Sequence, residues 1–238
     1  AADSSIGGAG MVITGLMKKL IRIALIVLLI IAAIYFMFVR SWILRMGVTD
    51  EELNMSMPGD GLVSSPSMQY IQAITISAPK EKVWDYLIQV GYKRAGWYNW
   101  DFINGAFVKD YFYENNKSAD RIIPELQNLK QGDKIYLAPP IGLDVSELNE
   151  NSSMLLTSNE KGKYVVAWSY MLKELDVDKT RLYVRWTSDL PGGIALKLLN
   201  LLITEPGGAG IQQSQMLKGI KQRAEADYSV DRSTWRKP

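Results

Sequence analysis

The segment 91–101, GYKRAGWYNWD, brings two glycines, two cations and four aromatic rings together. Aromatic side chains offer flat surface that loses little rotamer freedom on binding, and a guanidinium can stack on a ring or hold an anionic group. The segment is therefore a candidate wall of a ligand site. The alternative is that its rings pack in a core and that its arginine pairs with a carboxylate such as Asp101. Ligand contacts are predicted for Arg94, Trp97, Tyr98 and Trp100.

Two later segments, 163–172 (KYVVAWSYML) and 180–186 (TRLYVRW), alternate in the manner of strands, which places every second residue on one face. One face must meet a core or a cavity, and the sequence leaves open which. Arg185 is mid-strand. An arginine facing a cavity needs an anionic ligand or a carboxylate, because an unpaired buried charge is costly; the alternative is a solvated outward arginine. The further ligand-contact candidates are Tyr136, Trp168, Arg185 and Trp186.

Cysteine and histidine are absent from all 238 residues. This excludes thiolate nucleophiles, disulfides, Cys/His zinc sites and every dyad or triad that uses imidazole as a base. Acid–base chemistry would have to come from Asp, Glu, Lys or Tyr, and we predict no catalytic residue, no metal site and no cofactor. The net charge of +2 gives no field that favours a polyanion, so no nucleic-acid partner is expected.

One segment predicts a membrane anchor. Residues 23–39 carry no charge, and two apolar residues before Arg22 extend this run to the ~20 residues that cross a bilayer as a helix. A cleaved signal peptide is the alternative, because basic residues precede the run. The run is long for a signal peptide, however, and no small-residue cleavage site follows it. We expect a single-pass membrane protein. Three cations precede the span and two follow it. This small excess favours a cytoplasmic N-terminus with the domain on the outer side.

The remaining chain predicts one strand, one helix, a series of strands and a helical end. A connecting arm at 49–68 contains a capped helix start and a PGDG turn. A strand at 70–77 leads into a helix opened by Pro79, and a short helix is expected at 121–127. The helical end comprises 194–203, read as a packed lid over a cavity or as an interfacial helix at the membrane, and 209–226. The later strands are expected at 134–138, 143–148, 153–158, 163–172 and 180–188.

This order of elements predicts an α+β fold in which a curved antiparallel sheet surrounds a long C-terminal helix, preceded by one transmembrane helix. A curved sheet that only partly contacts its helix leaves a concave, apolar cavity. At least two of the five rings of Trp97, Tyr98, Tyr136, Trp168 and Trp186 are expected to line it. The predicted division is a flexible N-terminus (1–15), the transmembrane helix (16–42), the connecting arm (43–69), a ligand-binding domain (70–226) and a polar tail (227–238).

From about Met46 to Glu225 the chain resembles the START-like, helix-grip superfamily, also described as SRPBCC or polyketide cyclase/dehydrase-like. The resemblance rests on an ordered series of segments: MGVTDEEL with MPGDGLV, ITISAPKEKVWDYLIQVGYKRAGWY, RIIPELQNLKQGDKIYL, AWSYML, TRLYVRW and MLKGIKQRAE. It implies a helix-grip fold with a deep cavity for lipids, sterols, polyketides or other apolar molecules. Most members of this branch have no assigned ligand, so the resemblance speaks to fold more than to reaction.

Three functional hypotheses follow. The first is a membrane-anchored binding module whose partners are the bilayer and an apolar small molecule or lipid. The second is a cyclase- or dehydratase-type enzyme that uses Tyr98, Tyr136, Asp101 or Arg185 as polar groups in the cavity. The third is an accessory subunit of a larger membrane complex.

Overall fold

The structure is a computed structural model that describes residues 4–108, 110–114, 116–189, 192–201, 204 and 210–235. They form two compact units, divided between Trp42 and Ile43. The first unit is helical, and because its helix begins at Ser4, most of the segment predicted to be a flexible N-terminus is helical. The helical elements are α1 (Ser4–Ile34), a π-helical stretch (Tyr35–Val39) and α2 (Arg40–Leu44), which ends inside the second unit.

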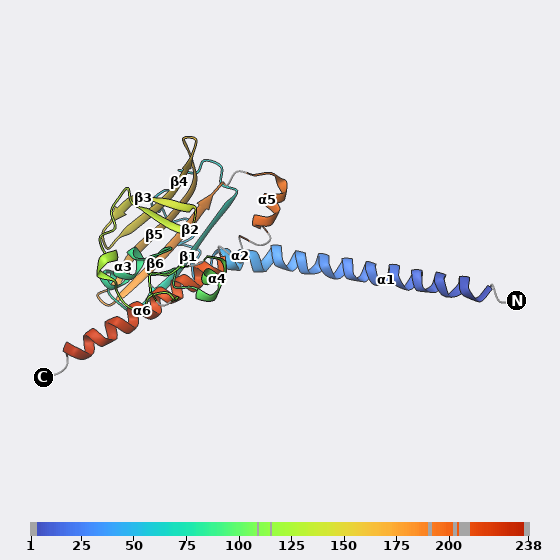
Figure 1. Ribbon diagram of the computed structural model, residues 1–238, viewed down its shortest axis with the longest axis horizontal. Helices are drawn as coiled ribbons and strands as arrows, with labels where there is room; N and C mark the ends of the chain where they lie inside the picture. The colour runs from blue at the N-terminus through green and yellow to red at the C-terminus, as the bar shows by residue number, and fades with distance from the viewer. Residues whose placement is uncertain are drawn as a thin grey trace. The chain divides into compact units, whose positions relative to one another are not determined.

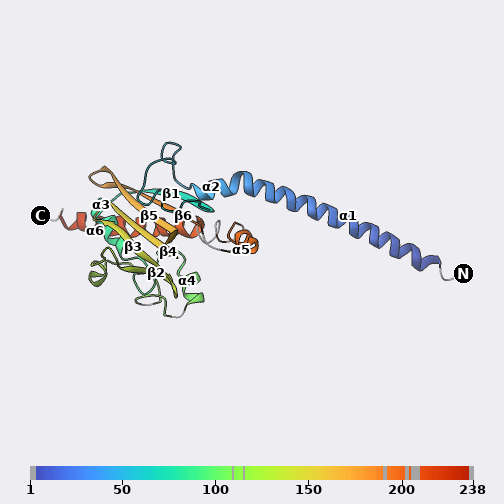
Figure 2. The same ribbon diagram turned by 90° about the horizontal axis from the view of Figure 1, so that it is seen from above.

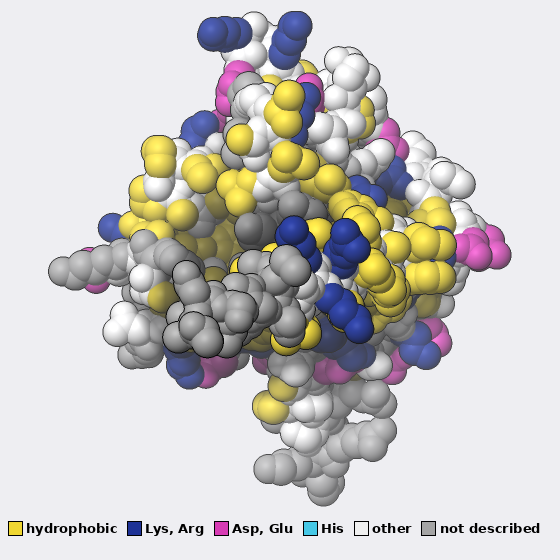
Figure 3. Space-filling view, turned by 90° about the vertical axis from the view of Figure 1, so that its right-hand side faces the viewer, with side chains coloured by type: hydrophobic (Ala, Val, Ile, Leu, Met, Phe, Trp, Pro, Cys, Tyr) yellow, Lys and Arg dark blue, Asp and Glu magenta, His cyan; other side chains and the backbone are white. Residues whose placement is uncertain are grey.

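One helical segment, Gly15–Leu44, is long and apolar enough to cross a membrane by its length and composition. Its leucines, isoleucines and phenylalanines are mostly exposed. A helix that is apolar all round is stable only where other apolar material surrounds it. Figure 3 shows one face of the molecule, on which hydrophobic side chains are numerous and acidic ones lie toward the margin.

The second unit contains a six-stranded antiparallel sheet that curls around a long helix (Figures 1 and 2). The strand order is β1-β6-β5-β4-β3-β2, so β2 to β6 form a meander and β1 joins it beside β6. Two-residue turns connect β4 to β5 and β5 to β6. The predicted helix-grip fold is confirmed. The strands are β1 (Met68–Ile76), β2 (Lys134–Ala138), β3 (Ile141–Asn149), β4 (Ser153–Glu160), β5 (Lys163–Asp176) and β6 (Lys179–Ser188).

Helices α3 (Lys80–Ile88) and α6 (Gln212–Trp235) cover one face of the sheet. In α6 the buried residues recur at helical spacing, at Met216, Leu217, Ile220 and Ala224. Two short helical elements, α4 (Asp101–Phe107) and a 3-10 turn (Pro124–Leu126), lie between α3 and β2. The expected helix at 121–127 is thus reduced to this turn.

Helix α6 continues past the predicted end at residue 226, so the predicted polar tail is helical as far as Trp235. Lys82 of α3 explains this extension, because its ammonium group lies 3.1 Å from Asp227 and 3.0 Å from Asp231. The two carboxylates are one helical turn apart and can therefore share one cation. Polar residues here mark the outer turns of a helix that is paired with α3.

The alternation along β6 assigns its two faces. Leu182 and Val184 are fully buried in the cluster that contains α3 and α6. Tyr183 lies in a second cluster on the opposite face, together with Met57 of the arm. Arg181 and Arg185 share that face, because alternate residues of a strand point the same way. The cavity-facing residues of β6 are therefore the even-numbered ones.

The arm is part of the folded unit and covers the face of the sheet opposite α6. Met57 packs there against β1 and β6, and Val63 packs against Leu155 and Ala167 of β4 and β5. Two arginines of β6, the half-buried Arg181 and the buried Arg185, fix the arm: Arg181 pairs with Glu52, and Arg185 pairs with Asp60. The segment 43–69, predicted to be a connection, therefore completes the core of the domain.

Glu52 is expected to make the domain sensitive to acid. Burial opposes its ionisation, but hydrogen bonds from Arg181, the Thr49 backbone and the Tyr183 hydroxyl outweigh that effect and lower its pKa from 4.5 to about 2. A depressed pKa in the folded state contributes stability above pH 4.5 that is lost as the pH falls toward about 2. We expect Glu52→Gln to cost about 2 kcal/mol of unfolding free energy at pH 7.

Urea denaturation at several pH values measures this effect. The difference between wild type and Glu52→Gln should shrink as the pH falls from 4.5 toward 2. Asp50→Asn is the matched control, because Asp50 pairs with Arg45 at 3.5 Å with both side chains largely exposed; it should change stability by less than about 0.5 kcal/mol. A difference for Glu52→Gln that does not depend on pH would contradict the assignment.

Candidate ligand cavity

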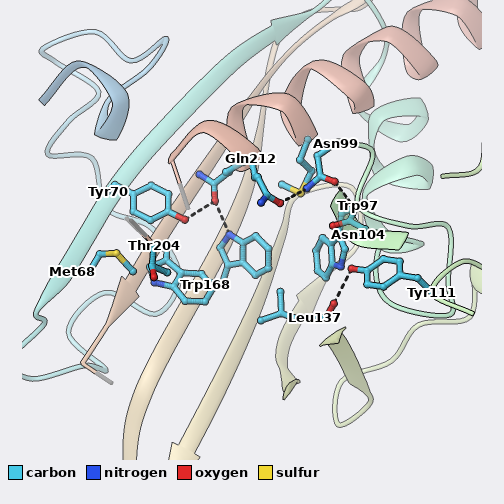
Figure 4. A pocket seen from close by; sticks show the side chains of 13 residues that line it. Met68, Tyr70, Trp97, Asn99, Asn104, Tyr111, Leu137, Trp168, Thr204 and Gln212 are labelled. Carbon is cyan, nitrogen blue, oxygen red and sulfur yellow. Dashed lines mark hydrogen bonds between the residues drawn. The ribbon is translucent and has the colours of Figure 1, made fainter. Parts of the chain in front are cut away.

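A cavity of about 320 Å³ lies between the N-terminal part of α6 and the sheet (Figure 4). This volume is at the lower end of the range of ordinary ligand sites. Three tryptophans and two methionines give it an apolar character. It is lined by Met68, Tyr70, Trp97, Asn99, Asn104, Tyr111, Leu137, Trp168, Trp186, Thr204, Gln212, Gln213 and Met216.

The apolar wall is built on Trp168 of β5. Its ring stacks on that of Trp97, with centroids 5.1 Å apart and planes at 23°. The ring of Trp186, on the neighbouring strand β6, meets it edge-on at 5.2 Å. Trp168 and Trp186 are register partners in the β5–β6 pair, which is why they lie side by side. Three rings from distant parts of the chain thus form one continuous surface.

The turn at 91–96 sets the position of Trp97. Gly91 and Gly96 exchange two backbone hydrogen bonds of 3.0 and 3.2 Å, and their φ values of 128° and 80° favour glycine. Beyond the turn, the Tyr98 backbone N–H donates to the Ser118 hydroxyl, which itself donates to Asp101. The glycine, cation and aromatic pattern thus encodes a closed turn that leads one tryptophan into the cavity.

Gln213 holds the deep polar side of the cavity. Its Oε1 accepts hydrogen bonds from Trp168 Nε1 at 2.9 Å and from the Tyr70 hydroxyl at 3.3 Å. Its amide donates to Gln72, which in turn donates to the backbone carbonyls of Ile43 and Gly210. This buried network connects the cavity wall to Ile43, the residue at which the chain enters the domain.

A second polar group lies nearer the surface of the cavity. The amide of Asn104 donates to Asn99 Oδ1 at 2.6 Å, and the amide of Asn99 donates to Gln212 Oε1 at 3.2 Å. These three side chains, from α4, the segment before it and α6, form an amide relay. Beside it, the Tyr111 hydroxyl donates to the Leu137 carbonyl at 2.8 Å, and burial raises the pKa of this hydroxyl. Tyr111 therefore stays neutral at ordinary pH.

Of the eight residues predicted to contact ligand, the structure brings Trp97, Trp168 and Trp186 together in the cavity. The other five are absent from its lining within the described part of the chain. Arg94 is half-buried and donates to the backbone carbonyls of Ile88, Val90 and Leu126. A cation at the C-terminal end of α3 satisfies carbonyls that have no helical partner. Arg94 therefore stabilises the end of α3 and lies outside the described cavity lining, and the alternative pairing with Asp101 is not observed.

Tyr98 is buried against α6, with the Arg223 guanidinium 4.5 Å from its ring centroid and its hydroxyl bonded to Gln89 at 2.6 Å. Burial raises its pKa, so it remains a neutral core residue. Trp100 and Tyr136 have exposed fractions of 39% and 41% and lie on the surface. The predicted cavity contacts of these three rings are not observed.

Arg185 lies on the arm side of the sheet. Its guanidinium binds both carboxylate oxygens of Asp60, at 2.7 and 2.8 Å, and the Met55 carbonyl at 2.9 Å. The prediction of a cavity-facing arginine is therefore wrong, and so is the alternative of a solvated one, because Arg185 is 6% exposed. The four polar groups of the enzyme hypothesis, Tyr98, Tyr136, Asp101 and Arg185, do not converge in the described cavity lining.

The segment 194–203 is only partly described, as α5 (Ile194–Leu199) and the two residues that follow it. The described large apolar side chains of α5, Ile194, Leu198 and Leu199, are exposed. A packed lid would bury them, so that prediction is wrong for these residues. The interfacial alternative stays a prediction. Residues 202 and 203 lie outside the described residues, and Thr204 reaches the cavity lining.

The four amides that line the cavity, and Gln72, which is hydrogen-bonded to one of them, are absent from the sequence prediction. For Gln72 a signal existed: in the strand 70–77 it shares the inward face with Tyr70, Ile74 and Ile76, where a polar side chain needs a buried partner. Gln213 similarly shares a helical face with Met216 and Ile220. Asn99, Asn104 and Gln212 gave no such signal, since single amides in loops and at helix ends are common.

The topology and the cavity together define a helix-grip domain with an interior pocket. No protein family profile matches the chain, and no curated protein matches it. Solved structures do match. The Zhui aromatase/cyclase from Streptomyces sp. R1128 is 16% identical, covers 66% of this chain and 93% of its own, and has a TM-score of 0.35.

Two further solved structures are similar at the same level. The self-sacrificing resistance protein CalC from Micromonospora echinospora is 10% identical, covers 68% of this chain and 96% of its own, and has a TM-score of 0.38. A Polyketide_cyc-like protein from Corynebacterium glutamicum is 12% identical, covers 72% of this chain and 95% of its own, and has a TM-score of 0.31. Similarity at this level carries no inference about the ligand or the activity of this chain.

Proposed function

We propose that the chain is a membrane-anchored helix-grip domain that binds an apolar small molecule or lipid in the cavity between α6 and the sheet. One observation carries this proposal: three tryptophans from separate parts of the chain form a continuous wall around about 320 Å³. Tryptophans in a filled core would pack on one another without leaving such a volume. Concave sites of this size and apolar character are where proteins bind small ligands.

The bilayer is the proposed second partner. The apolar helix Gly15–Leu44 supports anchoring, because about 20 apolar residues span the hydrocarbon layer. We expect the protein to remain in membranes after washing with alkaline carbonate. Recovery of a soluble chain that begins after residue 40 would show instead that the segment is a cleaved signal peptide.

Trp97→Ala tests the binding proposal. Apolar molecules are extracted from the purified protein with organic solvent, and thermal unfolding of wild type and variant is followed with and without the extract. A bound ligand raises Tm because it stabilises the folded state by mass action. If Trp97 contacts ligand, Trp97→Ala reduces the rise in Tm that the extract causes by more degrees than it reduces the Tm measured without the extract.

Trp100→Ala is the matched control, since Trp100 precedes α4 outside the described lining. It should keep the full extract-dependent rise in Tm. An equal rise for wild type and Trp97→Ala would contradict the proposal.

A further inference from the structure

The described lining of the cavity contains no charged side chain. Its polar groups are two tyrosines, one threonine, four amides and the indole N–H groups of the tryptophans. An ionised ligand group without an opposite charge loses its hydration on burial at a large cost in free energy. The chemistry of the lining therefore disfavours an anion or a cation.

The arginines that could have held an anionic group are already engaged. Arg94 is held by the backbone carbonyls of Ile88 and Val90 at the end of α3 and by that of Leu126 in the 3-10 turn. Arg185 is paired with Asp60 on the opposite face of the sheet. Neither arginine could therefore pair with a carboxylate or phosphate in the cavity.

The amide relay offers a different kind of recognition. Asn104, Asn99 and Gln212 are joined by two hydrogen bonds, and within the described part of the chain the Gln212 Nε2 and Asn104 Oδ1 groups make none. If all three amides were turned over, the same two bonds would run in the opposite direction. In either orientation the relay leaves one donor and one acceptor group at its ends. This pair suits a neutral oxygen, either a carbonyl or a hydroxyl.

We propose that the cavity selects uncharged ligands, with an apolar body on the tryptophan wall and a carbonyl or hydroxyl oxygen bound by the amide relay. The proposal rests on the proposed binding function and adds the charge class and the polar group of the ligand. It also assigns Gln212 and Asn104 as the residues that determine specificity.

Three probes with one ring system separate these contributions: naphthalene, 2-acetylnaphthalene and 2-naphthoate. Their binding to the full chain in detergent micelles is measured at pH 7.5 by equilibrium dialysis, with the uptake of empty micelles subtracted. We expect the ketone to bind most tightly, with an affinity at least about tenfold higher than that of the carboxylate. Gln212→Leu should lower the affinity for the ketone by about fivefold, which corresponds to the loss of one neutral hydrogen bond, and leave the affinity for naphthalene unchanged.

Gln222→Leu is the matched control, because Gln222 is an exposed residue of the same helix; it should leave the binding of all three probes unchanged. Asn104→Leu is the second variant, for the reversed orientation of the relay in which the Asn104 amide is the free donor. A ketone oxygen only accepts, so one of the two variants should show the fivefold loss. A carboxylate that binds as tightly as the ketone, or a ketone affinity that neither variant changes, overturns the inference and leaves the binding function standing. If none of the three probes binds, both the inference and the proposed function fail.

Discussion

Trp168→Ala is expected to lower the free energy of unfolding by about 3–5 kcal/mol. Trp168 is buried at the centre of the aromatic wall, in contact with the rings of Trp97 and Trp186. Removing its indole leaves a space on one side of both rings and takes one donor from the buried Gln213 oxygen. The cost therefore combines lost packing with a weakened polar network. Urea denaturation of the full chain in detergent measures it.

Trp168→Phe separates these two contributions. A phenyl ring retains most of the contact with the neighbouring rings but has no N–H for Gln213, so this variant should lose only about 1–2 kcal/mol. If Trp168→Ala were no less stable than Trp168→Phe, the ring would have no packing role, and the described wall would be incorrect.

Asp60→Asn is expected to lower the free energy of unfolding by about 2–4 kcal/mol, because it leaves the Arg185 guanidinium buried without its counter-charge. The side chain of Asp60 is 37% exposed and that of Arg185 is 7% exposed, so water can replace only part of the lost interaction. The arm should also detach more readily, which limited proteolysis at 46–63 would detect. Ligand binding should stay unchanged, since Arg185 lies on the far face of the sheet from α6.

A double-mutant cycle is the control for this prediction. Arg185→Met removes the buried charge, so the double variant Asp60→Asn with Arg185→Met should be more stable than the sum of the two single changes implies. Additive effects would mean that the two side chains do not interact. If Arg185→Met lost ligand binding without losing stability, Arg185 would have to be a ligand contact.

The sequence predicted the fold well because that prediction rests on local periodicity. The strand at 134–138 has the same bounds in the structure, and the meander follows from short polar turns between alternating segments. The face of each strand was harder to predict, since alternation separates two faces but does not say which meets the helix. The arm decides this question: its apolar residues Met57 and Val63 cover one face and leave the other to α6.

The candidate site was predictable only where the residue type limits the alternatives. Large rings on inward strand positions must pack or line a space, and Trp168 and Trp186 do both. The arginines were not predictable, because Asp60 lies 125 residues from Arg185 in the sequence and the partners of Arg94 are backbone carbonyls. No pattern in a sequence marks a backbone carbonyl as the partner of a cation. A cation near aromatic rings was therefore predicted to contact a ligand.

Native mass spectrometry of the gently purified full chain tests the central claim, that the cavity holds an apolar molecule, most directly. We predict one non-protein molecule per chain, which is lost after extraction with organic solvent and is absent from Leu137→Trp. Leu137 lines the cavity and is only half-buried, so a larger ring there can fill the space without disrupting a packed core. A wild-type chain that carries no such molecule, or a molecule that Leu137→Trp retains equally well, would contradict the account.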